Sequence, residues 1–189
     1  MAIKPILFNT EMGRAILDGR KSCTRRIIKP QPQGYFEVSE EPLYIYDTDG
    51  KQGKITPPYQ PGDILYVRET WKQAPNGYYY YEDWQRNDIA DVTKWKPSIH
   101  MPKEAARIWL KVTDVRVERL LEITPQGAWK EGARCSCLHP VPDCAGNKTA
   151  FVNIWNSTIK KSDLGQHGWD ANPYVWVISF ERCEKPEGV

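Results

Sequence analysis

The sequence predicts an α+β fold: a small, mixed and partly antiparallel β-barrel with two to four short helices. Two observations favour this class. About six short segments have the alternating hydrophobicity of strands, and short helical stretches lie between them. The chain has no internal repeat and no regular strand–helix–strand alternation, which argues against a doubly wound parallel sheet. Its 189 residues are enough for a single domain with a buried core.

The first expected element is a helix over residues 10–17. Asn9 or Thr10 can cap its start, apolar residues recur within it at helical spacing, and Gly19 provides a C-terminal stop. The Pro- and Gln-rich stretch 29–34 that follows is typical of a loop.

The middle of the chain favours short strands. Residues 35–60 are expected to form strands around a turn at 47–50. A second turn at 61–63 precedes residues 64–70, which alternate well enough to form a strand. The tyrosine tract 78–81 predicts another strand between polar loops.

Residues 108–120 give the clearest strand pattern. Its alternation changes phase between Val112 and Val115, which predicts a β-bulge at Thr113–Asp114. Residues 174–183 predict the last strand of the chain.

Two further helices are expected between these strands. Thr124 and Pro125 are a strong start signal, with the hydroxyl as cap and proline in the first helical position. That helix should end near Gly132. Another begins at Thr149 and carries apolar side chains on one side: Phe151, Ile154, Trp155 and Ile159.

Basic residues are concentrated at the N-terminus. The formal net charge is only +2, yet residues 1–30 contain seven Lys or Arg against two Asp or Glu. Such a cluster is typical of a phosphate-binding surface, although it also occurs on solvated faces that only keep a protein soluble.

The chain is expected to reside in the cytoplasm. Cys23 and Cys183 lie far from the other three of its five cysteines, so a disulfide framework is not expected. No window approaches the roughly 20 apolar residues that a membrane span needs. Residues 1–7 lack the long apolar run of a secretory signal. No membrane partner is therefore predicted.

Residues 17–26, LDGRKSCTRR, resemble the G-x-K-x-x-T-x-R motif of the ASCH family, a branch of the PUA-like barrels. Three further stretches, 62–67, 123–132 and 175–180, are similar to that family in order and spacing. Residues 97–102 and 168–173 look like the longer members found in bacteriophages and prophages. The resemblance implies one ASCH/PUA-like domain over residues 1–189, with insertions around 31–60, 72–100 and 133–172.

The resemblance also implies a ligand, RNA or a modified nucleoside, in a cleft beside the first motif. One branch is similar to amidohydrolases that remove the acetyl group of N(4)-acetylcytidine without a cofactor. Their catalytic set falls on Lys21 as base, Thr24 as nucleophile and Glu131 as proton relay. The side-chain period of a strand is two, so Lys21 and Thr24 converge only if the chain turns between them.

Other side chains are candidates for holding the ligand. Basic candidates for the base or a phosphate flank the catalytic pair: Arg20, Arg25 and Arg26. Trp71 is a candidate for stacking on a base, Glu69 for accepting from an exocyclic amine, and His100 for a ligand contact. Each has a plainer interpretation: core packing for Trp71, an ion pair with Arg68 or Arg26 for Glu69, and a structural role for His100.

One cluster has the composition of a structural zinc site. Four soft ligands lie within ten positions: Cys135, Cys137, His139 and Cys144. A tetrahedral Cys₃His site would pin a loop that otherwise has little to pack against. The alternative is three reduced loop thiols with a surface histidine.

Three functions follow from these patterns. The sharpest is hydrolysis of an N-acyl group on a nucleobase, and the first alternative is a nucleic-acid-binding module without catalysis. The second alternative is a phage-associated protein-interaction factor that has kept the barrel and lost the site. Turnover of an acetylated nucleoside separates the first from the other two.

Overall fold

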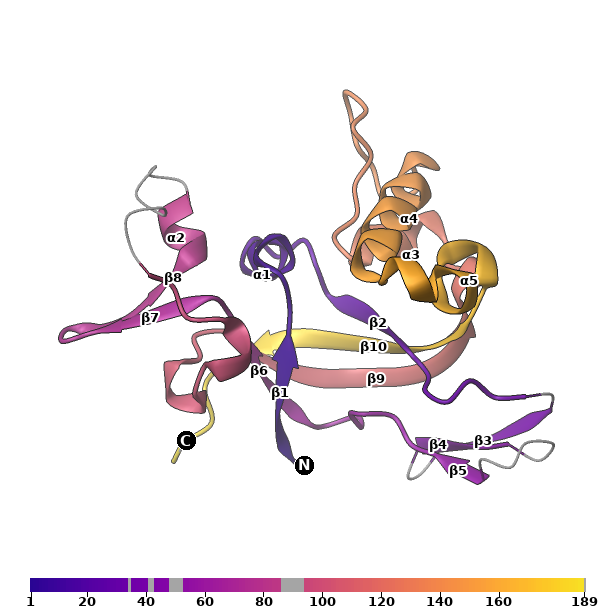
Figure 1. Cartoon of the computed structure of the whole chain (residues 1–189), viewed down its shortest axis with the longest axis horizontal. Coiled ribbons are helices and arrows are strands. Elements are labelled where there is room, and N and C mark those ends of the chain that lie inside the picture. The colour runs from indigo at the N-terminus through magenta and orange to yellow at the C-terminus, as the bar shows by residue number, and fades with distance from the viewer. Residues whose placement is uncertain (34, 41–42, 48–52, 86–93, 189) are drawn as a thin grey trace.

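The computed structural model of the chain describes residues 1–33, 35–40, 43–47, 53–85 and 94–188 (Figure 1). Its main sheet has the strand order β1-β6-β9-β10-β2 among these residues. Neighbouring strands are antiparallel except β1 and β6, which are parallel. The strands are β1 (Ile3–Leu7), β2 (Cys23–Ile27), β6 (Ile64–Arg68), β9 (Trp109–Arg119) and β10 (Tyr174–Cys183). The α+β class is therefore confirmed.

The two longest strands, β9 and β10, run side by side through the molecule (Figure 1). Their register shifts once, because Ser179 pairs with Asp114 whereas Phe180 pairs with Val112. Thr113 is thus the extra residue, and the bulge predicted at this point is confirmed. The bulge returns Val115 to the buried side after Val112, which explains the change of phase in the sequence.

The barrel that the sequence predicted is not closed among the described residues. Strands β1 and β2 are the two edges of the sheet, and no backbone pairing joins them in this part of the chain. A side chain links them instead: Arg26 donates a hydrogen bond of 2.7 Å to the carbonyl of Leu7. We call the gap between the two unpaired edge strands, β1 and β2, the open seam of the sheet. The chain that connects these strands contains Phe8, whose ring lies beside Arg26, and helix α1 (Thr10–Leu17).

Two smaller sheets flank the main one. Strands β3 (Phe36–Glu40), β4 (Leu43–Asp47) and β5 (Gly53–Ile55) form an antiparallel sheet, as expected for this region. The turn predicted at 47–50 lies, beyond Asp47, outside the described residues. Strands β7 (Trp71–Ala74) and β8 (Gly77–Tyr80) form a hairpin, and Tyr81 begins helix α2 (Tyr81–Gln85) instead of extending β8. Sequence patterns did not predict β1, β2 or β7.

The predicted helices form largely where they were expected. Asn9 caps α1 by accepting a bond of 2.9 Å from the Met12 amide. Thr124 caps α3 (Pro125–Lys130) through the Gly127 amide. Helix α4 (Gly146–Thr158) begins three residues before the predicted Thr149 and needs no side-chain cap. It is followed by α5 (Leu164–His167), and none of the described helices combines the length and apolar composition that crossing a bilayer requires.

Short 3-10 turns complete the secondary structure. They are η2 (Ser98–His100), η3 (Lys103–Ala105), η4 (Leu120–Glu122), η5 (Lys161–Asp163) and η6 (Trp169–Ala171).

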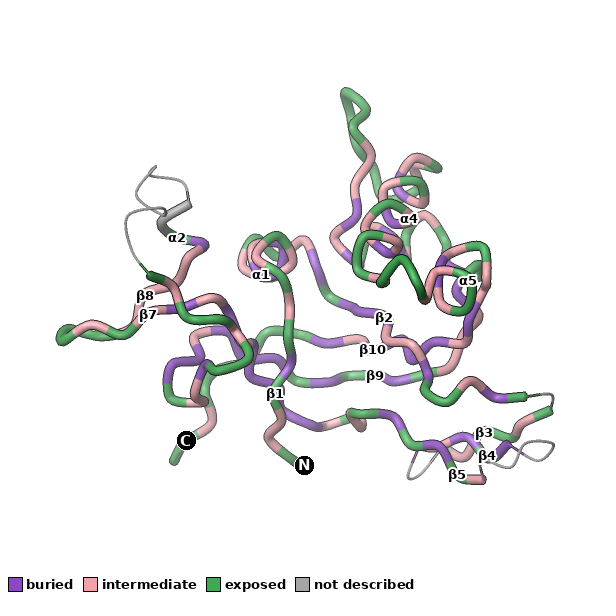
Figure 2. The backbone as a smooth tube through the Cα atoms, in the orientation of Figure 1, coloured by how far each residue is buried: buried purple, intermediate pink, exposed green. Residues whose placement is uncertain are grey.

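Strand β10 separates two hydrophobic clusters, and buried residues follow the central strands (Figure 2). Trp176, Ile178 and Phe180 belong to the main core of the sheet. The alternate residues Val175 and Val177 pack in a second cluster with residues of α3 and α4. These helices therefore cover one face of the sheet near strand β2, and Figure 1 shows them gathered above that end.

Candidate functional site

The segment that carries the predicted catalytic residues leaves α1 through a left-handed turn. Gly19 has a φ of +69°, a conformation that glycine adopts without steric cost. The amides of Arg20 and Lys21 then both donate to the Ala15 carbonyl, at 2.7 and 3.0 Å. This turn ends the helix, and Lys21 lies before β2 begins at Cys23. The turn that Lys21 and Thr24 require in order to converge is therefore present.

Lys21 and Glu131 form a buried ion pair. The Lys21 ammonium donates to Glu131 Oε2 at 2.8 Å and to its backbone carbonyl at 2.9 Å. Only 2% of the Lys21 side chain and 7% of the Glu131 side chain are exposed. Glu131 is the C-terminal cap of α3, where the helix dipole attracts a cation. The pair therefore fixes the end of α3 to the start of β2.

Arg25 extends this pair into a charged network. It donates to Glu131 Oε1 at 3.2 Å and to Glu118 Oε2 at 2.7 Å. Burial opposes ionisation of Glu118, but hydrogen bonds from Arg25 and Arg116 outweigh it and lower the pKa of that carboxyl. The interactions of Arg25 with these carboxylates make it a structural member of the site.

Thr24 and Arg26 lie on the same side of β2, because side chains alternate along a strand. Their partners across the sheet are Ile178 and Trp176, whose side chains point into the main core. Thr24 is buried, and its hydroxyl makes no hydrogen bond within the described residues. Both side chains therefore place polar groups on the inner face at the open seam of the sheet.

Arg26 is a half-buried cation. Its guanidinium lies 5.4 Å from the centre of the Phe8 ring and donates to the Leu7 carbonyl. Burial lowers the pKa of Arg26 from its ordinary value. Within the described ranges it has no carboxylate partner, so most of its donors remain available to a ligand.

Cys23, between Lys21 and Thr24, belongs to the other side of the strand. Burial raises the pKa of Cys23 to about 12, and the nearby Glu131 adds to this effect. The Cys23 thiol is therefore kept neutral and does not compete with the Thr24 hydroxyl as a nucleophile.

Lys21, Thr24 and Glu131 line one cavity of about 170 Å³. Arg25 and Arg26 also line it, so three cationic side chains face a single carboxylate. This volume is below the roughly 300–1,000 Å³ of sites that enclose a whole drug-sized ligand. The cavity therefore suits a fragment the size of a nucleobase with a hydrogen-bond acceptor or an anionic group.

The rest of the cavity wall is mostly apolar and was not predicted as part of a site. One part comes from the end of β1 and the start of α1: Leu7, Phe8, Asn9 and Met12. The other comes from α4: Phe151, Ile154, Trp155 and Thr158. The apolar side of α4 was expected from its periodicity, but a helical stripe does not distinguish a cavity wall from core packing.

Arg20 lies beside this cavity and not in it. It pairs with Asp18 at 3.1 Å and lines a neighbouring hollow that shares Asn9 and Met12 with the first. Arg20 therefore lies next to the cavity that Lys21 and Thr24 line.

Three predicted binding residues lie elsewhere. Trp71 is 4% exposed and packs in a separate cluster with Tyr78 and Met101, so its ring is not available to a base in the cavity. Glu69 pairs with Arg107 at 2.8 Å, not with Arg68 or Arg26 as the plainer interpretation had it. His100 is exposed in η2 and does not line the cavity.

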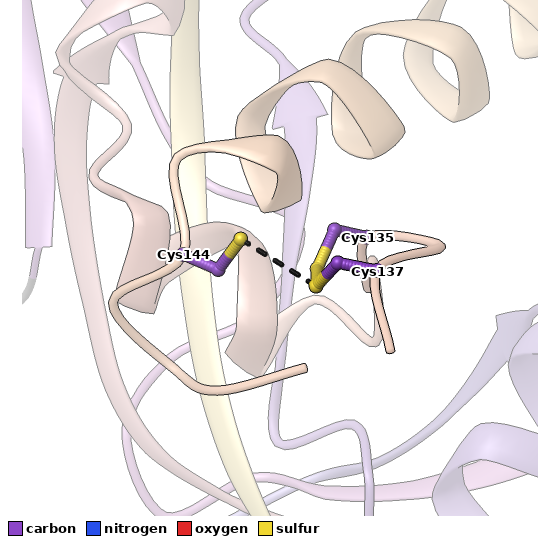
Figure 3. A group of neighbouring side chains, drawn as sticks. All are labelled: Cys135, Cys137 and Cys144. Carbon is purple, nitrogen blue, oxygen red and sulfur yellow. Dashed lines mark hydrogen bonds between the residues drawn. A yellow bond between two sulfur atoms is a disulfide. The ribbon is translucent and has the colours of Figure 1, made fainter. Parts of the chain in front are cut away.

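The cysteine loop places three of the four predicted metal ligands together (Figure 3). The sulfur atoms of Cys135, Cys137 and Cys144 all lie within 4.8 Å of one another. Cys135 and Cys137 are joined as a disulfide, and Cys144 Sγ is 3.8 Å from Cys137 Sγ. His139 is exposed and is not part of the cluster.

The fold and the cavity together define an α+β protein with a small, cationic, partly apolar pocket at the open seam of its sheet. No protein-family model matches the chain, and no curated protein matches it.

Two solved structures are similar in arrangement. An ASCH domain from Lactobacillus crispatus JV V101 has 12% sequence identity and a TM-score of 0.45, over 96% of this chain and 79% of that one. A protein from Enterococcus faecalis V583, described under the family model DUF984, has 11% identity and a TM-score of 0.45, over 97% and 76%.

Proposed function

We propose that this protein binds RNA or a modified nucleoside, with a base or acyl-base group in the cavity between β2, α1 and α4. The observation that carries the proposal is Arg26: a half-buried cation without a carboxylate partner in the described ranges, beside the free hydroxyl of buried Thr24. Burial removes part of the water that would solvate the Arg26 guanidinium, and a ligand acceptor in the cavity replaces that water.

The charge and lining of the cavity support this class of ligand. Lys21, Arg25 and Arg26 exceed the two carboxylates that they contact, Glu131 and Glu118, by one charge, which favours phosphate or electron-rich carbonyl groups. Phe8 and Trp155 provide apolar surface for the body of a heterocycle. Arg20, next to the cavity, is positioned to meet a backbone phosphate.

Calorimetric titration with cytidine, N(4)-acetylcytidine and a short single-stranded RNA tests the proposal. Arg26→Gln should weaken binding about tenfold or more, because it removes a charge-assisted bond while keeping a polar side chain. Arg182→Gln, an exposed arginine away from the cavity, is the control and should bind normally. Equal affinities for the two variants, or no ligand that raises the melting temperature of the wild type, would overturn it and favour an interaction factor.

A second candidate, amide hydrolysis, is favoured by one observation: Lys21, Thr24 and Glu131 line the same cavity. Lys21 can act as a base only after its ammonium proton has passed to Glu131, to which it is already hydrogen-bonded. Thr24 Oγ then attacks the acyl carbon and gives its proton to the neutral Lys21 amine. The C–N bond breaks, the amino group of the base leaves with that proton, and water hydrolyses the Thr24 ester to a carboxylic acid.

Release of cytidine and acetate from N(4)-acetylcytidine measures this activity. Thr24→Val should keep nucleoside binding and lower turnover by about 100-fold or more, since it removes the nucleophile with little change in volume. Thr113→Val, at the exposed bulge of β9, is the matched control. Binding without turnover in the wild type would leave the binding module as the function.

A further inference from the structure

We propose that Cys135, Cys137 and Cys144, in their reduced state, bind one Zn²⁺ ion, and that this site fixes the N-terminal end of α4. The proposal does not depend on the identity of the ligand in the cavity. It differs from a Cys₃His site in its ligand set, because His139 is not in the cluster.

The spacing of the sulfur atoms fits a tetrahedral ion. Two thiolates bound to one Zn²⁺ at about 2.3 Å lie about 3.8 Å apart at the tetrahedral angle. The Sγ atoms of Cys137 and Cys144 are 3.8 Å apart. Figure 3 shows the Cys144 sulfur pointing toward the other two from the opposite side of the cluster. One ion can therefore reach all three sulfur atoms once the Cys135–Cys137 bond is opened and these two side chains have rotated apart.

The backbone around the sulfur atoms is held in place by close packing and by hydrogen bonds. A Cβ atom at position 146 would lie 2.7 Å from Cys135 Cβ, so the close approach of these chains requires glycine there. Asn147 is fully buried and accepts a bond of 2.9 Å from the Cys135 amide. Its Nδ2 donates to the carbonyls of Val141 and Pro142. One side chain thus holds both arms of the cysteine loop.

The cysteine cluster also lies next to the start of a long helix. Cys144 is two residues before the 13-residue helix α4 begins at Gly146. The cysteine sulfurs are the only cluster of three or more metal-ligating side chains that the described residues contain.

The disulfide and the metal-bound cluster are alternative states of the same three thiols. A dithiol reductant supplies two electrons and two protons to open the Cys135–Cys137 bond and is itself oxidised to a disulfide. Zn²⁺ then binds the three sulfur atoms with release of their protons. Cys137 is exposed, so a water molecule can reach the fourth position.

The cysteine cluster is connected to the candidate cavity through helix α4. Helix α4 contributes Phe151, Ile154 and Trp155 to the cavity wall and starts directly after the cysteine loop. An ion that pins the loop to the first turn of α4 therefore holds that wall in place.

Metal analysis of the full chain, reduced and kept under nitrogen, tests the proposal. The wild type should retain about one Zn²⁺ per chain after desalting, and so should Cys183→Ser, which removes a cysteine outside the cluster. Cys144→Ser should lose about nine-tenths of it. Co²⁺ in place of Zn²⁺ should give a thiolate charge-transfer band in the near ultraviolet, and its visible bands should not change in His139→Ala, because His139 lies outside the cluster.

A second measurement covers the case in which Cys144→Ser fails to fold. A chelator should lower the melting temperature of the reduced wild type and of Cys183→Ser by several degrees, with recovery on adding Zn²⁺. Reduced wild type that binds no Co²⁺ and does not respond to chelation would overturn the site. So would metal retention in a folded Cys144→Ser variant equal to that of the wild type.

Discussion

Lys21 donates hydrogen bonds to both the carboxylate and the carbonyl of Glu131, a residue 110 positions further along the chain. This contact joins the first turn after α1 to the C-terminal cap of α3, and both residues line the candidate cavity. Two of the three ammonium protons are thereby committed to one residue. The same pair that positions the site is consequently part of what stabilises the fold.

Lys21→Met should destabilise the protein by about 3 kcal/mol, because it leaves a buried carboxylate with a weakened set of partners. Arg25 still donates to Glu131, so the loss of stability should lie near the lower end of the range expected for a broken buried ion pair. The free energy of urea unfolding measures it. Lys111→Met, an exposed position on β9, is the control and should change stability by less than about 0.5 kcal/mol. Equal effects at the two positions would contradict the prediction.

Gly132→Ala should lower the free energy of unfolding by about 2 kcal/mol or more. Its φ is +86°, and an added Cβ would lie 3.2 Å from Ala15 Cβ and 3.5 Å from Lys21 Cβ. Gly19→Ala is the matched control: it has a similar positive φ with nothing within 4 Å, so it should cost only the backbone term, about 1 kcal/mol. Thermal and urea unfolding of both variants separate packing from backbone strain; a larger loss at Gly19 would refute the packing contribution.

Asp63 should make stability fall in acid. Burial opposes its ionisation, but the Lys4 ion pair and the bonds from the Gln60 and Ala2 amides outweigh it and lower its pKa below 3.8. Its contribution is therefore present above pH 3.8 and is lost as the pH falls through the lower folded pKa. Asp63→Asn should be less stable than wild type at neutral pH, and the difference should shrink in acid. Unfolding curves at several pH values test this, and a constant difference contradicts it.

RNA binding through Arg26 should depend on salt. Each phosphate contact with a single strand contributes about 0.7 to the slope of log K against log salt. Arg26→Gln should reduce that slope by about this amount if the guanidinium meets a phosphate. A weaker affinity with an unchanged slope would instead place the guanidinium on a base carbonyl. Affinities at three or four salt concentrations distinguish these outcomes. An unchanged affinity of Arg26→Gln would show that Arg26 does not contact the RNA.

Local signals in the chain predicted much of the fold. The cap at Asn9, the Thr124–Pro125 start and the phase change at Thr113 each depend on neighbouring residues, and each is confirmed. Strand β2 was not predicted, because its run Thr24–Arg25–Arg26 lacks apolar alternation and forms a strand only through pairing with β10. The start of α4 was misplaced because the helix begins at Gly146 without a side-chain cap, so no capping hydroxyl marks it in the sequence.

The residues of the candidate site were also predicted only in part. The motif over residues 17–26 and Glu131 could be selected from residue types and spacing, and the structure brings Lys21, Thr24 and Glu131 to one cavity. Trp71 and Glu69 are also of suitable type, yet Trp71 packs in a separate cluster and Glu69 pairs with Arg107. Side-chain chemistry is visible in the sequence, but the direction in which a strand presents it is not.

By itself the sequence determined the class of fold, the bounds of α1, the start of α3 and a chemically coherent set of polar residues, since these follow from local spacing and composition. Only the tertiary structure decided that the sheet stays open between β1 and β2, that α4 closes one side of the cavity, and that His139 stays outside the sulfur cluster. Those outcomes depend on contacts between segments far apart in the chain, whose geometry is fixed by packing and not by any local pattern.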